Sequence, residues 1–172
     1  VEKGAAQLKE TVAKILDARE LSNEDYDSVV CMGEYFMANM LPAFLQSAGV
    51  KSKMVDSRSV LITDDNFSSA LPYYDESKAN VQSHLAPIAQ SGEVAVLQGF
   101  IGSTRDGRTT TLGRGGSDFS ATMFGAMLEA ENVEIWSDVD GVLTADPSLV
   151  QSAHRIRHMS FQEAAELAYF GA

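Results

Sequence analysis

A glycine-rich segment between a strand-like run and a helical pattern constrains the fold of this chain more than any other feature. Residues 109–118 read Thr-Thr-Thr-Leu-Gly-Arg-Gly-Gly-Ser-Asp, after the near-continuous apolar run 94–100. Apolar residues then recur at helical spacing: Phe119, Met123, Met127 and Leu128. Because glycine adopts positive φ readily, the segment allows a sharp turn that approaches a ligand closely. The order of strand, tight turn and helix predicts an α/β unit.

The same segment has the composition of an anion-binding turn. Ser117 and Asp118 stand where the helix is expected to begin, and Arg114 lies between the glycines. A helix N-terminus presents unpaired N–H groups and a partial positive charge, and a guanidinium binds carboxylate or phosphate through two parallel hydrogen bonds. A serine-capped glycine turn is also common as plain structure, so the residues alone leave both interpretations open.

Helical and strand-like patterns alternate along the rest of the chain. Helices are expected at 5–19, 34–48, 75–91 and 117–131, with interruptions expected at Pro42 and Pro87, and a last helix opens with the capping box of Ser160 and Glu163. Strands are expected at 28–32, 53–56, 94–99 and 133–137. This alternation predicts a largely parallel sheet covered by helices. Glu34, Arg114 and Asp138 would then lie at the carboxyl ends of strands, where such sheets bind ligands.

The composition and charge of the chain mainly exclude classes of binding partner. The net charge of −11 argues against nucleic-acid binding, and Arg105, Arg108 and Arg114 would supply local positive charge at a site. The apolar runs look too short to span a bilayer, and no signal peptide opens the chain, so no membrane association is expected. Cys31 is the single cysteine, which favours a reducing, cytoplasmic location.

The segment 109–118 occurs together with other motifs of one enzyme family. They are Gly33-Glu34, Gly99-Phe100-Ile101-Gly102, Ile135-Trp136-Ser137-Asp138-Val139-Asp140-Gly141-Val142, Thr144-Ala145-Asp146-Pro147, Glu163-Ala164-Ala165-Glu166-Leu167-Ala168 and Phe170-Gly171-Ala172. In order and spacing the chain resembles the aspartate kinases of the amino acid kinase family from about residue 20 to 172. The resemblance implies a three-layer α/β/α sandwich with a mainly parallel sheet, here incomplete.

The resemblance also implies an activity and its ligands. Aspartate kinases transfer the γ-phosphoryl group of ATP, with Mg²⁺, to the side-chain carboxylate of L-aspartate, the first step toward lysine, threonine and methionine. Because that carboxylate is already ionised at neutral pH, the reaction needs in-line positioning and neutralisation of developing charge rather than a general base. The implied full-length protein is a homo-oligomer.

The resemblance to the aspartate kinases also implies roles for single residues in the matching motifs of this chain. Glu34, Arg114 and Ser117 would bind aspartate, with Arg114 as the clamp on its carboxylate. Arg114 and Asp118 form the expected catalytic pair, in which Asp118 orients the substrate ammonium or a lysine. The nucleotide would be bound by Gly113, Gly115, Gly116, Ser137 and Asp138. No metal site of the protein's own is expected; for His154 and His158, four residues apart, a zinc site is a minor alternative to a basic surface.

Three positions depart from the family pattern. Met37 replaces a small hydroxyl residue near Glu34, Leu143 replaces an aromatic residue, and Ser148 replaces an arginine after Asp-Pro. These departures keep a non-catalytic amino acid or nucleotide-binding module open as an alternative, beside a kinase for acetylglutamate, glutamate, carbamate or UMP. Trp136, within an apolar expected strand, is interpreted as a core residue.

The resemblance also bears on the extent of the catalytic domain. Aspartate kinases open with a Lys-Phe-Gly-Gly motif and continue beyond the catalytic domain into regulatory domains, and neither is found in these residues. We therefore expect residues 1–172 to be part of a single catalytic domain, with little or no kinase activity on their own. Exposed apolar surface and an open sheet edge are expected in such a chain.

Overall fold

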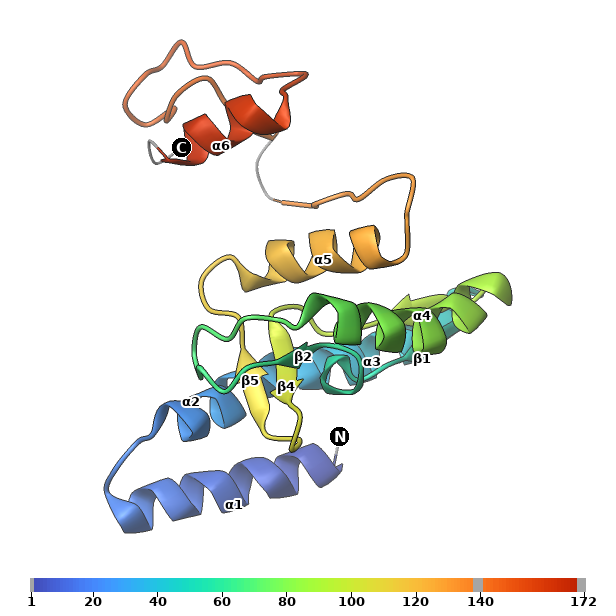
Figure 1. Ribbon diagram of the computed structural model, residues 1–172, viewed down its shortest axis with the longest axis vertical. Coiled ribbons are helices and arrows are strands. Elements are labelled where there is room, and N and C mark those ends of the chain that lie inside the picture. The colour runs from blue at the N-terminus through green and yellow to red at the C-terminus, as the bar shows by residue number, and fades with distance from the viewer. Residues whose placement is uncertain (1, 138–140, 170–172) are drawn as a thin grey trace. The chain divides into compact units, whose positions relative to one another are not determined.

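The computed structural model describes residues 2–137 and 141–169. Its contacts divide the chain into two compact units, Val1–Val133 and Glu134–Ala172, each described here by itself (Figure 1). The first unit contains α1 (Glu2–Ala18), α2 (Asn23–Val30), α3 (Met32–Ser47), α4 (Tyr74–Gln90) and α5 (Gly116–Met127), with a 3-10 turn η1 (Ser57–Ser59). Its strands are β1 (Ser52–Met54), β2 (Ile62–Thr63), β3 (Val94–Val96), β4 (Ile101–Thr104) and β5 (Thr109–Thr111).

The strands of the first unit form two small sheets. β1 and β3 pair in parallel, with Ser52 opposite Val94. β2 pairs in parallel with β4, and β4 pairs with β5 as an antiparallel hairpin in which Ile101 lies opposite Thr111. Parallel pairs joined through helices confirm the predicted α/β class in an incomplete form. The hairpin is an addition that the sequence did not predict, and it converts the first three residues of the glycine-rich segment into a strand.

Apolar side chains form two clusters around these strands. The larger cluster lies where α4 and α5 pack on the β2 side, and its fully buried members are Val60, Leu61, Val81 and Met127. Figure 1 shows α4 and α5 on one side of the strands and α1 and α2 on the other. The smaller cluster joins Cys31 and Met32, at the start of α3, to Ile101 in β4. This second cluster fixes α3 against the hairpin that leads to the glycine-rich turn.

Two of the predicted strands do not form. Residues 28–30 end helix α2, whose first turn is capped by the Ser22 hydroxyl accepting the Asp25 N–H at 3.1 Å. A four-residue apolar run fits a buried strand and a buried helix end equally well, and here the cap decides. Residues 133–137 pair with no strand among the described residues, and Trp136 is 89% exposed rather than part of a core.

The remaining predicted helices are confirmed. α1, α3, α4 and α5 match the expected helices to within a few residues, and both α3 and α4 continue through their prolines, Pro42 and Pro87. In the second unit α6 (Phe161–Tyr169) begins with the predicted capping box. There the Ser160 N–H donates to Glu163 Oε2 at 2.8 Å and the Glu163 N–H donates to Ser160 Oγ at 3.2 Å. This bonding lowers the pKa of Glu163.

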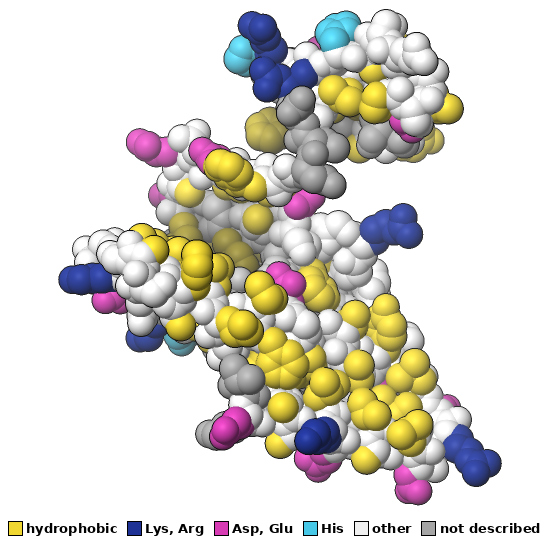
Figure 2. Space-filling view, turned by 180° about the vertical axis from the view of Figure 1, so that it is seen from behind, with side chains coloured by type: hydrophobic (Ala, Val, Ile, Leu, Met, Phe, Trp, Pro, Cys, Tyr) yellow, Lys and Arg dark blue, Asp and Glu magenta, His cyan; other side chains and the backbone are white. Residues whose placement is uncertain are grey.

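The stretch Asn23–Ser47 is more apolar than expected. This stretch of 25 residues is long and apolar enough to cross a membrane on length and composition alone, since an 18-residue window within it has a mean hydropathy of 1.2. The expectation that every apolar run is too short is therefore wrong here. The reason is that α3 is also apolar on its outer face, where Met37, Met40 and Phe44 are exposed. Figure 2 shows hydrophobic side chains spread in a band over this face of the first unit.

The burial of Cys31 leads to a testable chemical property. Burial raises the pKa of its thiol to about 11, which leaves little thiolate at pH 8. We expect iodoacetamide to react with the folded chain at least about 10-fold more slowly than with the urea-unfolded chain at that pH. The folded rate should keep rising toward pH 11, whereas the unfolded rate levels off near a pKa of about 8.5. Equal rates in both states would contradict this burial, and the single cysteine makes the measurement unambiguous.

Candidate functional site

The glycine-rich segment forms a tight turn between β5 and α5. Gly113 and Gly115 both have left-handed backbone angles, with φ of 77° and 71°, and Arg114 lies between them. The Gly116 N–H donates to the Gly113 carbonyl oxygen at 3.1 Å, which closes the turn directly before the helix. Only glycine takes such angles without strain, so the sequence Gly-Arg-Gly places Arg114 at the tip of the turn.

Two glycines are also required by close packing. A Cβ atom on Gly113 would lie 2.9 Å from the Ser68 carbonyl oxygen, and one on Gly116 would lie 2.7 Å from the Phe100 Cβ atom. Both distances are shorter than a carbon atom can approach without displacing its neighbour. The turn is therefore held between the segment around Ser68 and the backbone at Phe100, and it has little freedom to change shape.

The first turn of α5 borders an open hollow of about 320 Å³. Its lining residues are Phe100, Gly113, Gly115, Gly116, Ser117 and Asp118. The first N–H groups of a helix have no carbonyl partner within the helix and carry a partial positive charge. The predicted anion-binding turn thus has a hollow beside it that can hold a small anionic group.

Arg114 is available to a ligand. Its side chain is exposed, and within the described part of the chain it forms neither a hydrogen bond nor an ion pair. Ser117 and Asp118 are also exposed, in the first turn of α5. The structure therefore brings together Arg114, Ser117, Asp118 and the three predicted glycines at one end of one helix.

Phe100 borders this candidate site, although the sequence alone assigned it no role. It lines the hollow, has a φ of 50°, and donates its N–H to Ser120 Oγ at 3.1 Å. Its carbonyl oxygen accepts the Leu112 N–H at 2.9 Å. A left-handed angle is uncommon for a bulky residue and points to a constrained position. The sequence signal was its place between two glycines in Gly99-Phe100-Ile101-Gly102.

Glu34 lies in a different structural setting from the one predicted. It lies in the first turn of α3 and is exposed, so its expected position at a strand end is wrong. The start of α3 nevertheless packs on the hairpin through Met32 and Ile101, in a cluster that Phe100 also contacts. Phe100, which lines the hollow, therefore lies next to both the start of α3, which carries Glu34, and the glycine turn.

The remaining predicted nucleotide residues belong to the second unit. Ser137 is exposed there, and Asp138 lies outside the described residues. Ser148, one of the three departures, donates its N–H to Asp146 Oδ1 at 2.8 Å, and its hydroxyl bonds the same oxygen. These bonds lower the pKa of Asp146. His154 and His158 lie outside any helix, so they share no helical face. Among the described residues, no group of three His, Cys, Asp or Glu side chains could hold a metal ion.

The predicted cluster of three arginines is not a single binding surface. Arg105 pairs with Glu76 at 3.0 Å and lies over the Tyr73 ring. Arg108 pairs with Asp106 at 2.9 Å and with Glu24 at 3.3 Å. Their charges are compensated by acids of the same unit, which leaves Arg114 to act on a ligand.

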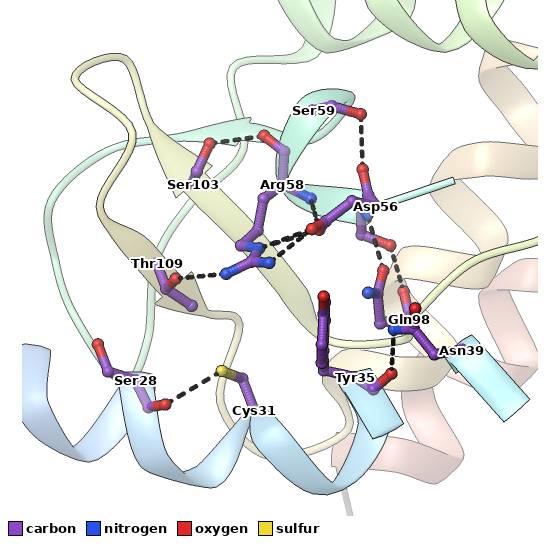
Figure 3. Close-up of polar contacts among 11 residues, drawn as sticks. Ser28, Cys31, Tyr35, Asn39, Asp56, Arg58, Ser59, Gln98, Ser103 and Thr109 are labelled. Atoms are coloured by element: carbon purple, nitrogen blue, oxygen red, sulfur yellow. Dashed lines mark hydrogen bonds and ion pairs between the residues drawn. The ribbon is translucent and has the colours of Figure 1, made fainter. Parts of the chain in front are cut away.

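A second polar cluster connects α3 to the start of β5 (Figure 3). Arg58 binds Asp56, with Nε 2.9 Å from Oδ1, and donates to Thr109 Oγ1 at 3.4 Å. Its guanidinium also lies over the Tyr35 ring, 5.2 Å from the ring centre. The hydrogen bonds with Asp56 raise the pKa of Arg58, so the charge is retained despite partial burial. Beside this cluster Gln98 accepts the Ser57 N–H at 2.7 Å.

These features define a class of protein: an α/β fold in which a glycine turn with an exposed arginine leads into a helix whose N-terminus borders an open hollow. A sequence profile described as the amino acid kinase family matches residues 2–172. The chain belongs to the amino acid kinase family.

The chain is similar to known aspartokinases along nearly its whole length. It is 39% identical over 168 residues to the lysine-sensitive aspartokinase 3 of Escherichia coli, covering 96% of this chain and 37% of that protein. It is 37% identical to the chloroplastic aspartokinase 3 of Arabidopsis thaliana, covering 98% and 30%. The crystal structure of E. coli aspartokinase III with aspartate and ADP superposes with a TM-score of 0.88, at 38% identity, covering 99% of this chain and 38% of that one. The chain thus spans less than two-fifths of these relatives.

Proposed function

We propose that these residues are the substrate-binding part of an aspartate kinase catalytic domain. The full-length protein would transfer the γ-phosphoryl group of ATP to the side-chain carboxylate of L-aspartate and release aspartyl phosphate and ADP. The observation that carries this proposal is Arg114, exposed at the tip of a close-packed glycine turn and paired with none of the residues that the structure describes. The likeness to an aspartokinase solved with aspartate and ADP supports it.

The proposed division of roles follows from charge and position. Arg114 would bind the α-carboxylate of aspartate through its planar fork, and Glu34 would bind the ammonium group. Ser117 and the N-terminus of α5 would stabilise the charge that develops as the phosphoryl group moves. Asp118, next to Ser117, would orient a cationic group at the transferred phosphate. Gly113, Gly115 and Gly116 would allow the phosphates to approach the backbone, while Ser137 and Asp138 would contribute to the nucleotide side.

Mg²⁺ would enter with the nucleotide. Magnesium is usually bound by substrate phosphates and waters together with one or two carboxylates, so it does not need a cage made wholly by the protein. Each of the other assignments stays a proposal: a homo-oligomer, no membrane or nucleic-acid partner, and a cytoplasmic location, with the chloroplast as the alternative suggested by plant relatives.

Trapping of the product tests the function directly. In the full-length protein with Mg-ATP and aspartate, hydroxylamine should convert aspartyl phosphate to aspartyl hydroxamate at a rate that depends on both substrates. Acetylglutamate, glutamate, carbamate and UMP should give no phosphorylated product. A folded full-length protein that binds aspartate or ATP but forms no hydroxamate would refute the kinase and favour a binding module. Turnover of one of the other acceptors would place the protein elsewhere in the family.

A further inference from the structure

A buried carboxylate lies between the helix that leads to Glu34 and the strand that leads to Arg114. Asp27, in α2, is fully buried. Its Oδ2 atom accepts two backbone N–H groups, from Ser68 at 2.8 Å and from Thr111 at 2.9 Å. Its Oδ1 atom faces two hydroxyl groups, Thr111 Oγ1 at 2.7 Å and Ser68 Oγ at 3.2 Å. Four bonds to two segments far apart in sequence make this carboxylate a bridge, because a buried charge is tolerated only when its bonds are satisfied.

Both segments held by Asp27 contact the glycine turn. Thr111 is the last residue of β5, two positions before Gly113, and its carbonyl oxygen accepts the Ala70 N–H at 2.9 Å. Ser68 has a left-handed φ of 67°, and its carbonyl oxygen is the atom that leaves no room for a side chain on Gly113. By accepting both the N–H and the hydroxyl group of Ser68, Asp27 stabilises this unfavourable backbone angle. The shape of the turn therefore depends on Asp27 through two contacts.

The other end of the bridge is the helix that leads to Glu34. The Asp27 carbonyl oxygen accepts the Cys31 N–H at 3.2 Å, and the Cys31 carbonyl oxygen accepts the Tyr35 N–H at 3.0 Å, so α2 runs almost directly into α3. Glu34 lies in that first turn of α3. If Asp27 moved relative to Thr111, α3, which carries Glu34, would therefore also move relative to the glycine turn that carries Arg114.

We propose that Asp27 is a positioning residue that holds the two halves of the aspartate site, Glu34 and Arg114, at a fixed separation. The inference rests on the proposed function for its substrate, but its physical content is the rigidity of the turn. Asp27 has no contact with the substrate. It acts by keeping the binding-competent arrangement populated, and a site that is competent only part of the time binds with proportionally lower affinity.

Four variants of the full-length protein test this role. Asp27→Ala leaves two buried N–H groups without an acceptor and should raise the KM for aspartate about 10-fold. Asp27→Asn should restore most of the affinity, because its carbonyl oxygen can accept both N–H groups while its NH₂ group donates to the two hydroxyls. Thr111→Val keeps the backbone bond and should raise KM about 3-fold. The matched control is Ser77→Ala, which removes a buried hydroxyl bonded to the Ile62 N–H and carbonyl groups, away from the turn.

The control separates positioning from general destabilisation. Ser77→Ala should lower the thermal unfolding midpoint but leave the KM for aspartate unchanged. If Asp27→Ala and Thr111→Val lower the midpoint and also leave KM unchanged, Asp27 is merely structural and the proposal is overturned. Thr111→Val decides the matter if Asp27→Ala does not fold.

Hydrogen exchange distinguishes a failure of this proposal from a failure of the proposed function. In Asp27→Ala, the amides of residues 112–118 should exchange at least about 10-fold faster than in the parent protein, with no such change in Ser77→Ala. This readout requires no turnover. Faster exchange in Asp27→Ala, together with no kinase activity in the parent protein, would support the bridging role of Asp27 and refute the proposed kinase function. If Asp27→Ala is active and its amides 112–118 exchange at the parent rate, the kinase function stands and the bridging role of Asp27 is refuted.

Discussion

Arg114→Ala is expected to lower kcat/KM for aspartate about 100-fold in the full-length protein without changing its thermal unfolding midpoint. The loss corresponds to about 3 kcal/mol, the upper end for a hydrogen bond to a charged group, because a bidentate contact with a carboxylate would be removed. Stability should be unaffected, since the guanidinium is exposed and pairs with no other described residue. Steady-state hydroxamate formation and calorimetry measure the two quantities.

Two companion variants sharpen this experiment. Arg114→Lys keeps the charge but not the planar fork, so we expect an intermediate loss of about 10-fold. Arg105→Ala is the matched control: it removes an arginine of the same unit that pairs with Glu76 and lies over Tyr73, and kcat/KM should stay within about 2-fold of the parent value. An Arg114→Ala protein with the parent KM for aspartate would show that the carboxylate is bound elsewhere.

Gly116→Ala should destabilise the protein by about 2 kcal/mol and abolish the hollow, although alanine normally favours a helix. The new Cβ atom would lie 2.7 Å from the Cβ atom of Phe100 and 3.0 Å from that of Leu112, so either α5 or the Phe100 backbone must move. Since both border the hollow, binding of the anionic ligand should be lost together with stability.

Gly33→Ala is expected to change the free energy of unfolding in the opposite direction. Gly33 lies inside α3, and a Cβ atom there would meet nothing within 4 Å. We expect this variant to gain about 0.5–1 kcal/mol, because alanine loses less backbone entropy in a helix. Urea unfolding of both variants measures the difference, and destabilisation of similar size in the two would contradict the close packing assigned to Gly116.

The local parts of the fold could be predicted from the sequence. The helices α1, α4 and α5 follow from apolar spacing, and the Ser160 capping box follows from two residues three positions apart. Strands were predicted less well because a strand depends on a partner that the sequence does not show. Residues 133–137 have strand-like composition without a described partner, whereas Thr109–Thr111 form a strand because Ile101 and its neighbours lie opposite.

The local arrangement of the candidate site could be predicted where its residues are contiguous in the sequence, and could not where they are not. Arg114, Ser117 and Asp118 belong to one continuous segment, so a sequence motif captures their arrangement. In the sequence Asp27 is one acid among many, just before an expected strand, and only the packing of α2 on β5 shows that it is buried. The same limit applies to Glu76 and Glu24, which pair with Arg105 and Arg108 but are far from them in the sequence.

The exposure of Trp136 gives the chain a built-in optical probe. It is the only tryptophan, it belongs to the second unit, and its indole N–H donates to Glu134 Oε2 at 3.1 Å at the surface. Indole emission therefore originates in the second unit. Any ligand or neighbouring segment that covers Trp136 would shift this emission toward the blue, so the emission wavelength reports on whether the indole is exposed or covered.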